Sequence, residues 1–222
     1  MPGRTIAVGD IHGCSIALRR LVKAIDLRSD DTLVALGDYV DRGIDSRGVL
    51  DFLIELAERC RLVPILGNHD EMMLGARQGR SDFKFWLACG GQSALDSYGE
   101  KGTLELVPRA HFRFLEKCRA WFETDKHFFV HANYLPDLPL GQQDVHALRW
   151  LSLRDHVPPQ HVSGKVAVVG HTPQALGEIL DIGYLKCIDT GCCSGGWLTA
   201  LDVGSGQVWQ VNERGTVRNA NG

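Results

Sequence analysis

The stretch TIAVGDIH, Thr5 to His12, joins a short apolar run to a glycine and to two side chains that can bind metal. An apolar run of four residues that ends at a glycine is typical of a buried β-strand. Residues Ser15–Ile25 follow with apolar side chains at helical spacing, which predicts a helix. The chain therefore begins with a strand, a loop and a helix, and the loop carries Asp10 and His12.

The same order of elements occurs twice more along the chain. The further predicted strands are Thr32–Leu36, ended by Gly37, and Arg61–Leu66, ended by Gly67, and the further predicted helices are Ser46–Glu58 and Asp70–Arg77. Alternation of this kind predicts parallel strands joined by right-handed crossovers, with helices covering the sheet. The first half of the chain is therefore of the α/β class.

The rest of the chain changes character at two points. Residues 82–120 carry helical stripes and are predicted to form a cap or a flank of the sheet. Strand patterns return after Lys126, at His127–Val130, Lys165–Val169, Leu185–Ile188, Trp197–Val203 and Gln207–Val211, with a hairpin turn at 204–206. We expect a single domain over residues 1–213 and a polar C-terminal tail over 214–222.

Composition excludes several classes of protein. The 222 residues are 44% hydrophobic and 23% charged with a formal charge of -3, which is ordinary for a globular protein and gives no general attraction to nucleic acid or anionic membranes. No apolar run approaches the roughly 18 residues of a membrane span. The seven cysteines are odd in number and form no C-x-x-C pairs, which favours reduced thiols and a cytoplasmic location. Neither a nucleic-acid partner nor a membrane partner is expected.

Candidate metal ligands follow each of the first three predicted strands. Asp10 and His12 follow the first, Asp38 the second and Asn68 the third, at intervals of 28 and 30 residues from Asp10 to Asp38 to Asn68. The carboxyl ends of parallel strands form the ligand-binding edge of an α/β sheet, so these side chains are expected to meet there. One such residue alone is commonly a helix cap or a turn, but the recurrence makes that explanation weak.

Two histidines of the second half complete the candidate set. His131 and His171 each follow a strand-like run. A mixed set of Asp, His and Asn ligands without a thiolate suits manganese, iron or zinc better than calcium. The sequence thus predicts a metal site of nitrogen and oxygen ligands.

The candidate ligands stand in a set of ordered motifs, which are Gly9-Asp10-Ile11-His12-Gly13, Gly37-Asp38-Tyr39-Val40-Asp41-Arg42-Gly43, Gly67-Asn68-His69-Asp70, His131 and Gly170-His171-Thr172. Together these motifs resemble a known family, the phosphoprotein phosphatase branch of the calcineurin-like metallophosphoesterases, in its bacterial form. The resemblance covers about Ile6 to Asp202. It implies the family fold, a central β-sandwich of mixed sheets flanked by helices on both sides (α/β/β/α). Ala132 departs from the glycine of many relatives.

The resemblance also implies two divalent metal ions. One would be held by Asp10 and His12, the second by Asn68, His131 and His171, and Asp38 would bridge both. Manganese is the first expectation for both ions, with iron or zinc as alternatives. A water between two such ions loses a proton near neutral pH, and the resulting hydroxide attacks phosphorus in line.

Three further residues receive roles in this interpretation, and one more role falls to one of two arginines. Arg42 would clamp phosphate oxygens. His69 would donate a proton to the leaving group, and Asp41 would orient His69. A second phosphate-binding arginine is expected after His131, and spacing does not choose between Arg149 and Arg154.

The expected function is a Ser/Thr protein phosphatase, with dual specificity as an option, that acts on phosphoproteins or phosphopeptides. Asp41 next to Arg42 favours this activity, because symmetric dinucleoside-tetraphosphate hydrolases usually lack that aspartate. Such a hydrolase is the alternative, since the segment after Asp189 resembles it too; it would need an aromatic side chain to stack on a base, with Tyr39, Tyr134 and Trp150 as candidates. A metal-bound binding module is a third hypothesis, against which the intact ligand set argues. The sequence leaves the oligomeric state open.

Overall fold

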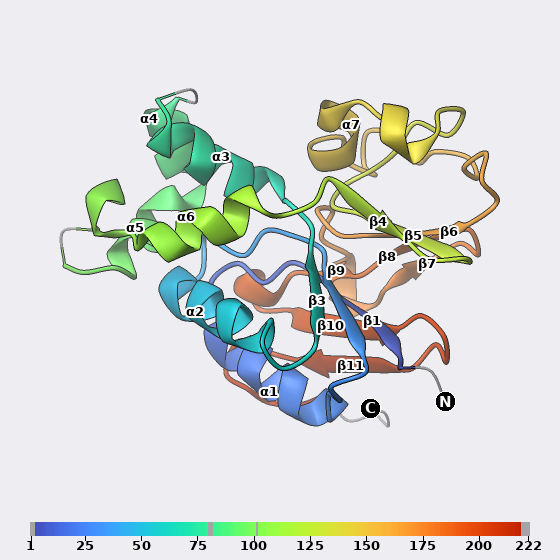
Figure 1. Ribbon diagram of the computed structural model, residues 1–222, viewed down its shortest axis with the longest axis horizontal. Coiled ribbons are helices and arrows are strands. Elements are labelled where there is room, and N and C mark those ends of the chain that lie inside the picture. Colours follow the sequence, from blue (N-terminus) through green and yellow to red (C-terminus); the bar gives the residue numbers. More distant parts are fainter. Residues whose placement is uncertain (1–2, 80–81, 101, 219–222) are drawn as a thin grey trace.

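Three parallel strands begin the fold. The computed structural model describes residues 3–79, 82–100 and 102–218 (Figure 1). Strands β1 (Thr5–Val8), β2 (Thr32–Ala35) and β3 (Arg61–Pro64) pair in parallel, and helices α1 (Ser15–Ile25) and α2 (Ser46–Leu56) connect them. The predicted repeat of strand and helix is therefore confirmed, with element ends that shift by one or two residues.

The first sheet is completed by strands from the end of the chain. Strand β10 (Trp197–Asp202) pairs antiparallel with β1, β11 (Val208–Val211) pairs antiparallel with β10, and β9 (Asp189–Thr190) pairs with β10 as well. The order is β11-β10-β1-β2-β3. The first sheet is thus mixed, with its parallel half built from the N-terminal repeat.

A second mixed sheet comes from the middle of the chain. Its order is β4 (Trp121–Glu123), β5 (His127–Val130), β6 (Val166–Val169), β8 (Leu185–Cys187) and β7 (Leu180–Asp181). The inner strands β5, β6 and β8 are parallel, while β4 and β7 are antiparallel edges. The predicted sandwich of mixed sheets is confirmed, although β4, β7 and β9, of two or three residues, were too short to be predicted.

Alternate side chains of each strand serve different layers of the core. In β1, Ala7 belongs to the buried cluster between the two sheets, together with Phe129 and Val168 of the second sheet. Its neighbours Ile6 and Val8 belong to the cluster that helices α1 and α2 cover. This alternation follows from the two-residue period of a strand, and it leaves both faces of the first sheet buried.

The outer face of the second sheet is covered largely by irregular chain. Phe128 and Val130 of β5 pack there with Tyr134, Leu140 and Leu148. The regular elements of this region are α7 (Val145–Arg149) and a 3₁₀ turn at Leu140–Gln142, and further 3₁₀ turns lie at Ala175–Gly177 and Cys192–Ser194. The predicted helical layer on this side is therefore thin.

The helical segment expected over residues 82–120 forms a flank. It comprises α4 (Phe83–Trp86), a kinked π-helical turn (Leu87–Gly91), α5 (Gln92–Asp96), a 3₁₀ turn (Leu104–Leu106) and α6 (Arg109–Glu116). These elements contact α2 and α3 (Asn68–Arg77) and lie beside the first sheet (Figure 1). Within the described residues, no helix combines the length and the apolar character that crossing a membrane requires.

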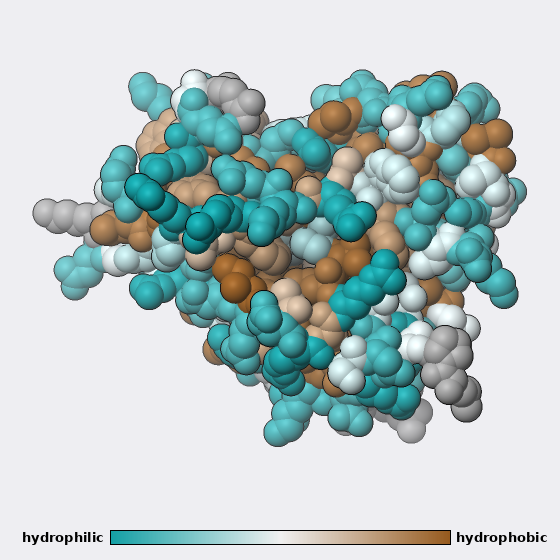
Figure 2. Space-filling view, in the orientation of Figure 1, coloured by the Kyte–Doolittle hydropathy of each residue, from teal (hydrophilic) through white to brown (hydrophobic). Residues whose placement is uncertain are grey.

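The edge of β3 joins the flank to the second sheet. The amide of Arg119 donates to the carbonyl of Pro64, and the amide of Leu66 donates to the carbonyl of Arg119. Backbone hydrogen bonds thus join the edge of the first sheet to the segment that leads into β4. Figure 2 shows a mostly hydrophilic face on this side of the molecule, with apolar side chains gathered near its middle.

The described part of the predicted C-terminal tail is ordered by contacts. Val217 forms a bridge with Val211, and the Arg218 guanidinium donates to the carbonyl of Gly177 and to Gln210. Residues 219–222 lie outside the described residues. The limit of the domain at residue 213 stays a prediction.

Candidate active site

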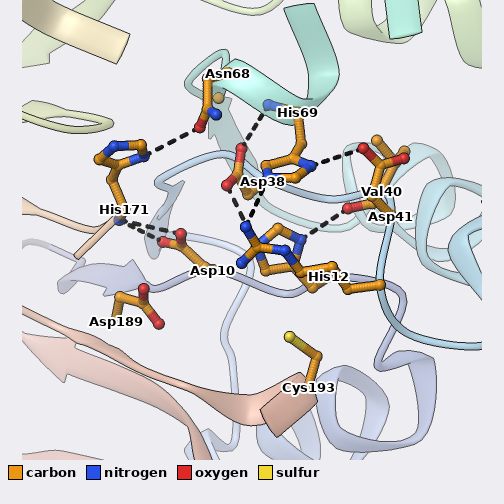
Figure 3. A network of polar contacts seen from close by, with 12 residues as sticks. Asp10, His12, Asp38, Val40, Asp41, Asn68, His69, His171, Asp189 and Cys193 are labelled. Carbon is orange, nitrogen blue, oxygen red and sulfur yellow. Dashed lines mark hydrogen bonds and ion pairs between the residues drawn. The ribbon is translucent and has the colours of Figure 1, made fainter. Parts of the chain in front are cut away.

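The predicted metal ligands come from the carboxyl ends of strands in both sheets. Asp10 and His12 follow β1, and Asp38 follows β2. Asn68 begins α3, directly after the loop that follows β3. His131 follows β5 and His171 follows β6. Because β1 to β3 are parallel, as are β5 and β6, these loops meet at one edge of the sandwich (Figure 3).

Three of the predicted ligands form a tight group. His131 Nε2 lies 3.2 Å from His171 Nδ1, and Asn68 Oδ1 lies 3.0 Å from each of these atoms. The other ring nitrogens face carbonyl oxygens, with His131 Nδ1 2.8 Å from Leu36 O and His171 Nε2 3.2 Å from Trp150 O. Each carbonyl oxygen accepts a hydrogen bond, so the ring nitrogen next to it must carry the proton. His131 Nε2 and His171 Nδ1, which face each other, therefore carry lone pairs. A cation between these acceptors would satisfy all three.

Asp38 lies between this group and His12. Its Oδ1 is 3.4 Å from His131 Nε2, and its Oδ2 is 3.3 Å from His12 Nε2. His12 Nδ1 donates to the carbonyl of Val40 at 2.9 Å, which leaves the Nε2 lone pair directed at Asp38. Asp38 is thus placed to offer one oxygen to each side.

The residues fit a pair of divalent ions. Donor atoms of His12, Asp38 and His69 lie within 4.8 Å of one another, and so do those of Asp38, His131 and His171. Asp10 accepts the amide of His171 with both carboxylate oxygens, at 3.0 and 3.1 Å. His69 thus lies beside His12 and Asp38, whereas Asp10 lies against the loop of His171.

Burial sets the charge state of the ligands. Desolvation lowers the pKa of His171 to about 4 and lowers the pKa of His131, so both rings are neutral and able to bind metal. Burial, with the negative charges of Asp189 and Asp38, raises the pKa of Asp10. Burial also acts to raise the pKa of Asp38, but the neighbouring histidines outweigh it and lower that pKa. Several carboxylates buried together would be stabilised by cations.

A second arrangement lies beside the His12 group. Asp41 Oδ2 is 2.7 Å from His69 Nδ1, and both side chains are buried. The indole of Trp86 donates to both Asp41 oxygens, at 3.1 and 2.9 Å. The Arg42 guanidinium lies 3.2 Å from His12 Nε2 and 3.0 Å from His69 Nε2. We call Asp41, Arg42 and His69 the acid arm.

Backbone strain concentrates at these loops. Seven non-glycine residues of the described chain have positive φ, and five of them are His12, Asp38, Asp41, Arg42 and His171. Such conformations cost free energy and cluster at functional sites, where surrounding contacts hold them. Asp70 supplies some of these contacts, because its carboxylate accepts the amides of Asp38, Tyr39 and Gly67 at 2.8 to 3.0 Å.

Asp70 also explains why α3 begins earlier than predicted. Its bond to the Gly67 amide closes the first helical turn, so the helix starts at Asn68 rather than at Asp70. A Cβ at Gly67 would lie 2.1 Å from Asp38 Oδ1, so only glycine allows this approach. The His69 amide then donates to Asp38 Oδ1 at 3.0 Å.

The two candidate arginines occupy different surroundings. Arg149, at the end of α7, is largely buried and forms an ion pair with Glu71 of α3. Trp150 donates to the same carboxylate at 2.8 Å. Arg154 is exposed and donates to the carbonyl of Pro173 at 3.2 Å, two residues after His171. Arg154 also borders a cavity of about 500 Å³ with Pro173 and Thr190.

Sequence reasoning missed three residues of this site. Trp86 belongs to a helical stripe in the flank, and nothing in its spacing points to Asp41. Asp70 was interpreted as the start of a helix rather than as the acceptor for three amides. Asp189, buried in β9 directly after β8, lies near Asp10 (Figure 3). Of these three residues, only Asp189 could have been predicted from the sequence, because it follows a predicted strand as the predicted ligands do.

Comparisons with known proteins agree with this architecture. Residues 3–194 match the calcineurin-like phosphoesterase family. Serine/threonine-protein phosphatase 1 of Salmonella typhimurium is 33% identical over 201 residues, covering 86% of this chain and 88% of that protein. The symmetrical bis(5'-nucleosyl)-tetraphosphatase of Photorhabdus laumondii is 46% identical over 261 aligned residues, covering 89% and 92%. The match to the enzyme of the same name in Legionella pneumophila (strain Lens) covers only 28% of that protein.

Solved structures share the fold at low sequence identity. One described as a putative diadenosine tetraphosphatase superposes with a TM-score of 0.73 at 24% identity, covering 95% of this chain and 94% of that chain. A cold-active protein-tyrosine phosphatase of a Shewanella species superposes with a TM-score of 0.70 at 16% identity, covering 98% and 80%. The family match, the relative from Salmonella and the shared fold lead to one conclusion: this chain belongs to the calcineurin-like phosphoesterase family and is a metal-dependent phosphoester hydrolase.

Proposed function

We propose that this chain is a phosphoprotein phosphatase that hydrolyses phosphoserine and phosphothreonine esters. The observation that carries the proposal is the 2.7 Å contact between Asp41 Oδ2 and His69 Nδ1 beside the metal-ligand cluster. An alkoxide is a poor leaving group and requires a proton, and a histidine oriented by a carboxylate can supply it. The 33% identity to a serine/threonine-protein phosphatase across most of both chains supports the same conclusion.

The proposed roles of the ligands follow from the donor set. Two divalent ions would neutralise charge on the phosphoryl oxygens and lower the pKa of a bound water, and their ligands would be Asp10, His12, Asp38, Asn68, His131 and His171. Hydrogen bonds from ring nitrogens to Val40 O, Leu36 O and Trp150 O hold the imidazoles in the tautomers that ligation needs. Manganese is the metal that we propose first.

The acid arm would act on the other side of the phosphorus. His69 Nδ1 donates to Asp41, and Nε2 accepts from Arg42 in this structure. Once Arg42 turns to the substrate, a second proton on Nε2 would face the ester and could pass to the leaving oxygen. The Arg42 guanidinium already lies against His69 Nε2 and His12 Nε2, where it would bind two phosphoryl oxygens when an ester enters. The planar fork of arginine suits this bidentate contact better than lysine does.

We propose Arg154 as the second phosphate-binding arginine. Arg149 already has a carboxylate partner in Glu71, and moving it would break this ion pair and leave the Trp150 indole as the remaining donor to that carboxylate. Arg154 is exposed, its described side-chain hydrogen bond goes to a carbonyl, and it lies near the His171 loop. Because this hydrogen bond to a carbonyl is weak, the Arg154 guanidinium can turn toward an anion at a small cost in free energy.

The alternative function is hydrolysis of dinucleoside tetraphosphates, which the relative from Photorhabdus laumondii favours. Two features argue against it. Tyr39 and Tyr134 are fully buried and cannot stack on a base, which leaves Trp150 of the three candidates. The alignment with that relative also spans 261 positions, more than the 222 residues here, so the relative has segments that this chain lacks.

The test compares two substrates under the same conditions. Phosphate release from a phosphoserine peptide and cleavage of diadenosine tetraphosphate are measured with manganese and with a chelator, using Asp38→Asn as the blank. We expect turnover of the peptide that disappears in the blank and with the chelator. Turnover of the dinucleotide alone would establish the alternative, and no metal-dependent turnover of either would favour a binding module.

A further inference from the structure

Two consecutive residues of the acid arm have an unfavourable backbone conformation. Asp41 has φ 71° and Arg42 has φ 63°, in the left-handed region that costs a residue with a Cβ free energy. The Asp41 carboxylate is also buried, and a buried carboxylate requires donors that stay in place. Contacts from another part of the chain must therefore hold these two residues in this geometry.

Trp86 holds the carboxylate. Its indole N–H lies 2.9 Å from Asp41 Oδ2 and 3.1 Å from Oδ1, and Oδ2 is the atom that also accepts from His69. The indole is fully buried, and a Cβ on Gly91 would lie 2.5 Å from its ring, so the backbone of Gly91 packs directly against it. The indole has no room to rotate, and the carboxylate is fixed in the plane that points Oδ2 at His69 Nδ1.

Gly90 holds the backbone of the next residue. The Arg42 amide donates to the carbonyl of Gly90 at 3.2 Å. Gly90 itself has φ 116°, and a Cβ there would lie 2.9 Å from Arg42 N and Cγ. Such a conformation and such a close approach are both open to glycine alone. The base of the Arg42 side chain therefore rests on the backbone of Gly90.

We infer that residues 86–91 form a positioning element for the leaving-group side of the reaction, in which Trp86 orients the Asp41–His69 pair and Gly90 sets the position of Arg42. The element belongs to the flank and contributes none of the predicted metal ligands. Proton donation to the leaving group is then adjustable separately from metal binding. This inference rests on the proposed function, because it assigns Trp86 an effect through His69.

The first test replaces Trp86 by Phe, which keeps an aromatic ring and removes the N–H. A phosphoserine peptide needs a proton on its leaving group, whereas 4-nitrophenyl phosphate hardly does. We expect kcat for the peptide to fall about tenfold more than kcat for the aryl ester, as the acid loses its orientation but not its proton. Manganese affinity, measured by calorimetry, should stay within twofold.

A matched control and a spectroscopic signal separate positioning from general damage. Trp121→Phe makes the same change in strand β4 of the other sheet, and it should leave the ratio of the two kcat values unchanged. The NMR signal of the His69 Nδ1 proton, which the short bond to Asp41 shifts downfield, should broaden in Trp86→Phe and not in Trp121→Phe. Equal losses on both esters, or an unaltered proton signal, would overturn the role of Trp86.

The second test changes Gly90. It does not depend on the first test and can be carried out even if Trp86→Phe folds poorly. Gly90→Ala would push its Cβ into Arg42 and displace the guanidinium. Weaker phosphate binding should raise KM severalfold for both esters alike and leave the ratio of their kcat values unchanged. An unchanged KM, or a change confined to one ester, would overturn the role of Gly90.

Failure of the inference differs from failure of the proposed function. Without metal-dependent turnover of either ester by the unaltered protein, the proposed function fails. If the unaltered protein turns over both esters and Trp86→Phe lowers kcat equally for both, the inference is rejected and the proposed function stands.

Discussion

The metal-ligand cluster and the acid arm lie side by side, yet they are built in different ways. Asp10, Asp38, His131 and His171 extend from the ends of paired strands, so backbone ladders place them. The acid arm starts in the same loop as Asp38, but its geometry depends on side-chain and backbone contacts with the flank. The cluster is an outcome of sheet register, whereas the acid arm is an outcome of packing.

This difference predicts different tolerance to change. Strand pairing distributes the position of each ligand over many hydrogen bonds, and one substitution outside the loops moves it little. The acid arm depends on a few contacts, each of which one substitution removes. Variants that affect only one of the two regions should therefore separate metal binding from proton donation.

The largest effect is expected for Asp38, which lies between the His12 group and the His131 group of the predicted metal ligands. Asp38→Asn replaces an oxygen placed between both ligand groups by an amide nitrogen that cannot bind a cation. We expect phosphate release to fall about 10³-fold or more, because charge neutralisation by metal is worth several kcal/mol. Turnover of 4-nitrophenyl phosphate and bound manganese are measured. Asp202→Asn, a buried carboxylate at the far end of β10, is the control that should keep its turnover.

His69→Asn should affect the acid arm alone. We expect kcat for a phosphoserine peptide to fall about 10²-fold and kcat for 4-nitrophenyl phosphate to fall much less, since a general acid contributes most where the leaving group is poor. Bound manganese should be retained. His111→Asn is the control, because His111 is also buried with a carboxylate partner, Asp51, outside the cluster. Equal loss on both esters would contradict the role of His69 as an acid.

The pH dependence of the free energy of unfolding tests an ion pair outside the site, that of Arg4 and Asp31. Burial acts to raise the pKa of Asp31, but hydrogen bonds from Arg4 and from backbone amides outweigh it and lower this pKa to about 2. A carboxylate whose pKa is lowered on folding stabilises the protein above its unfolded pKa. This contribution, about 2 kcal/mol, should be lost as the pH falls from about 4 to 2.

Urea unfolding between pH 7 and pH 2 measures this contribution. Asp31→Asn should reduce the loss of stability over the acid range, while Asp30→Asn, at the exposed neighbouring position, should not. If both variants keep the full acid dependence, the Arg4–Asp31 pair is not its source.

The smallest effect is expected for Arg149 and Arg154. Their variants show which of the two arginines contacts the phosphate. Arg154→Gln should raise KM for a phosphopeptide by up to about tenfold, the worth of one charge-assisted contact. Arg149→Gln should leave KM unchanged and lower the melting temperature, because Glu71 loses its ion-pair partner. The reverse pattern would assign the phosphate contact to Arg149.

Much of the cluster was predictable because it follows local rules. The apolar runs that end at Gly9, Gly37 and Gly67 predicted strands, and the polar residues after them predicted the loops that meet. The start of α3 was predicted two residues late, since the bond from the Gly67 amide to Asp70 is set by the fold of the loop. Strands β4, β7 and β9 escaped prediction because two or three residues carry no period.

The sequence by itself determined the fold class and the chemical types of the predicted ligands. Apolar periodicity and the glycines after strands are local properties, and parallel pairing turns them into a shared edge. Tertiary structure alone decided the partners of the acid arm, the engagement of Arg149 with Glu71 and the burial of Tyr39 and Tyr134. Contacts such as Trp86 with Asp41 join residues 45 positions apart in sequence, and only the packing of the flank against the sheet brings them together.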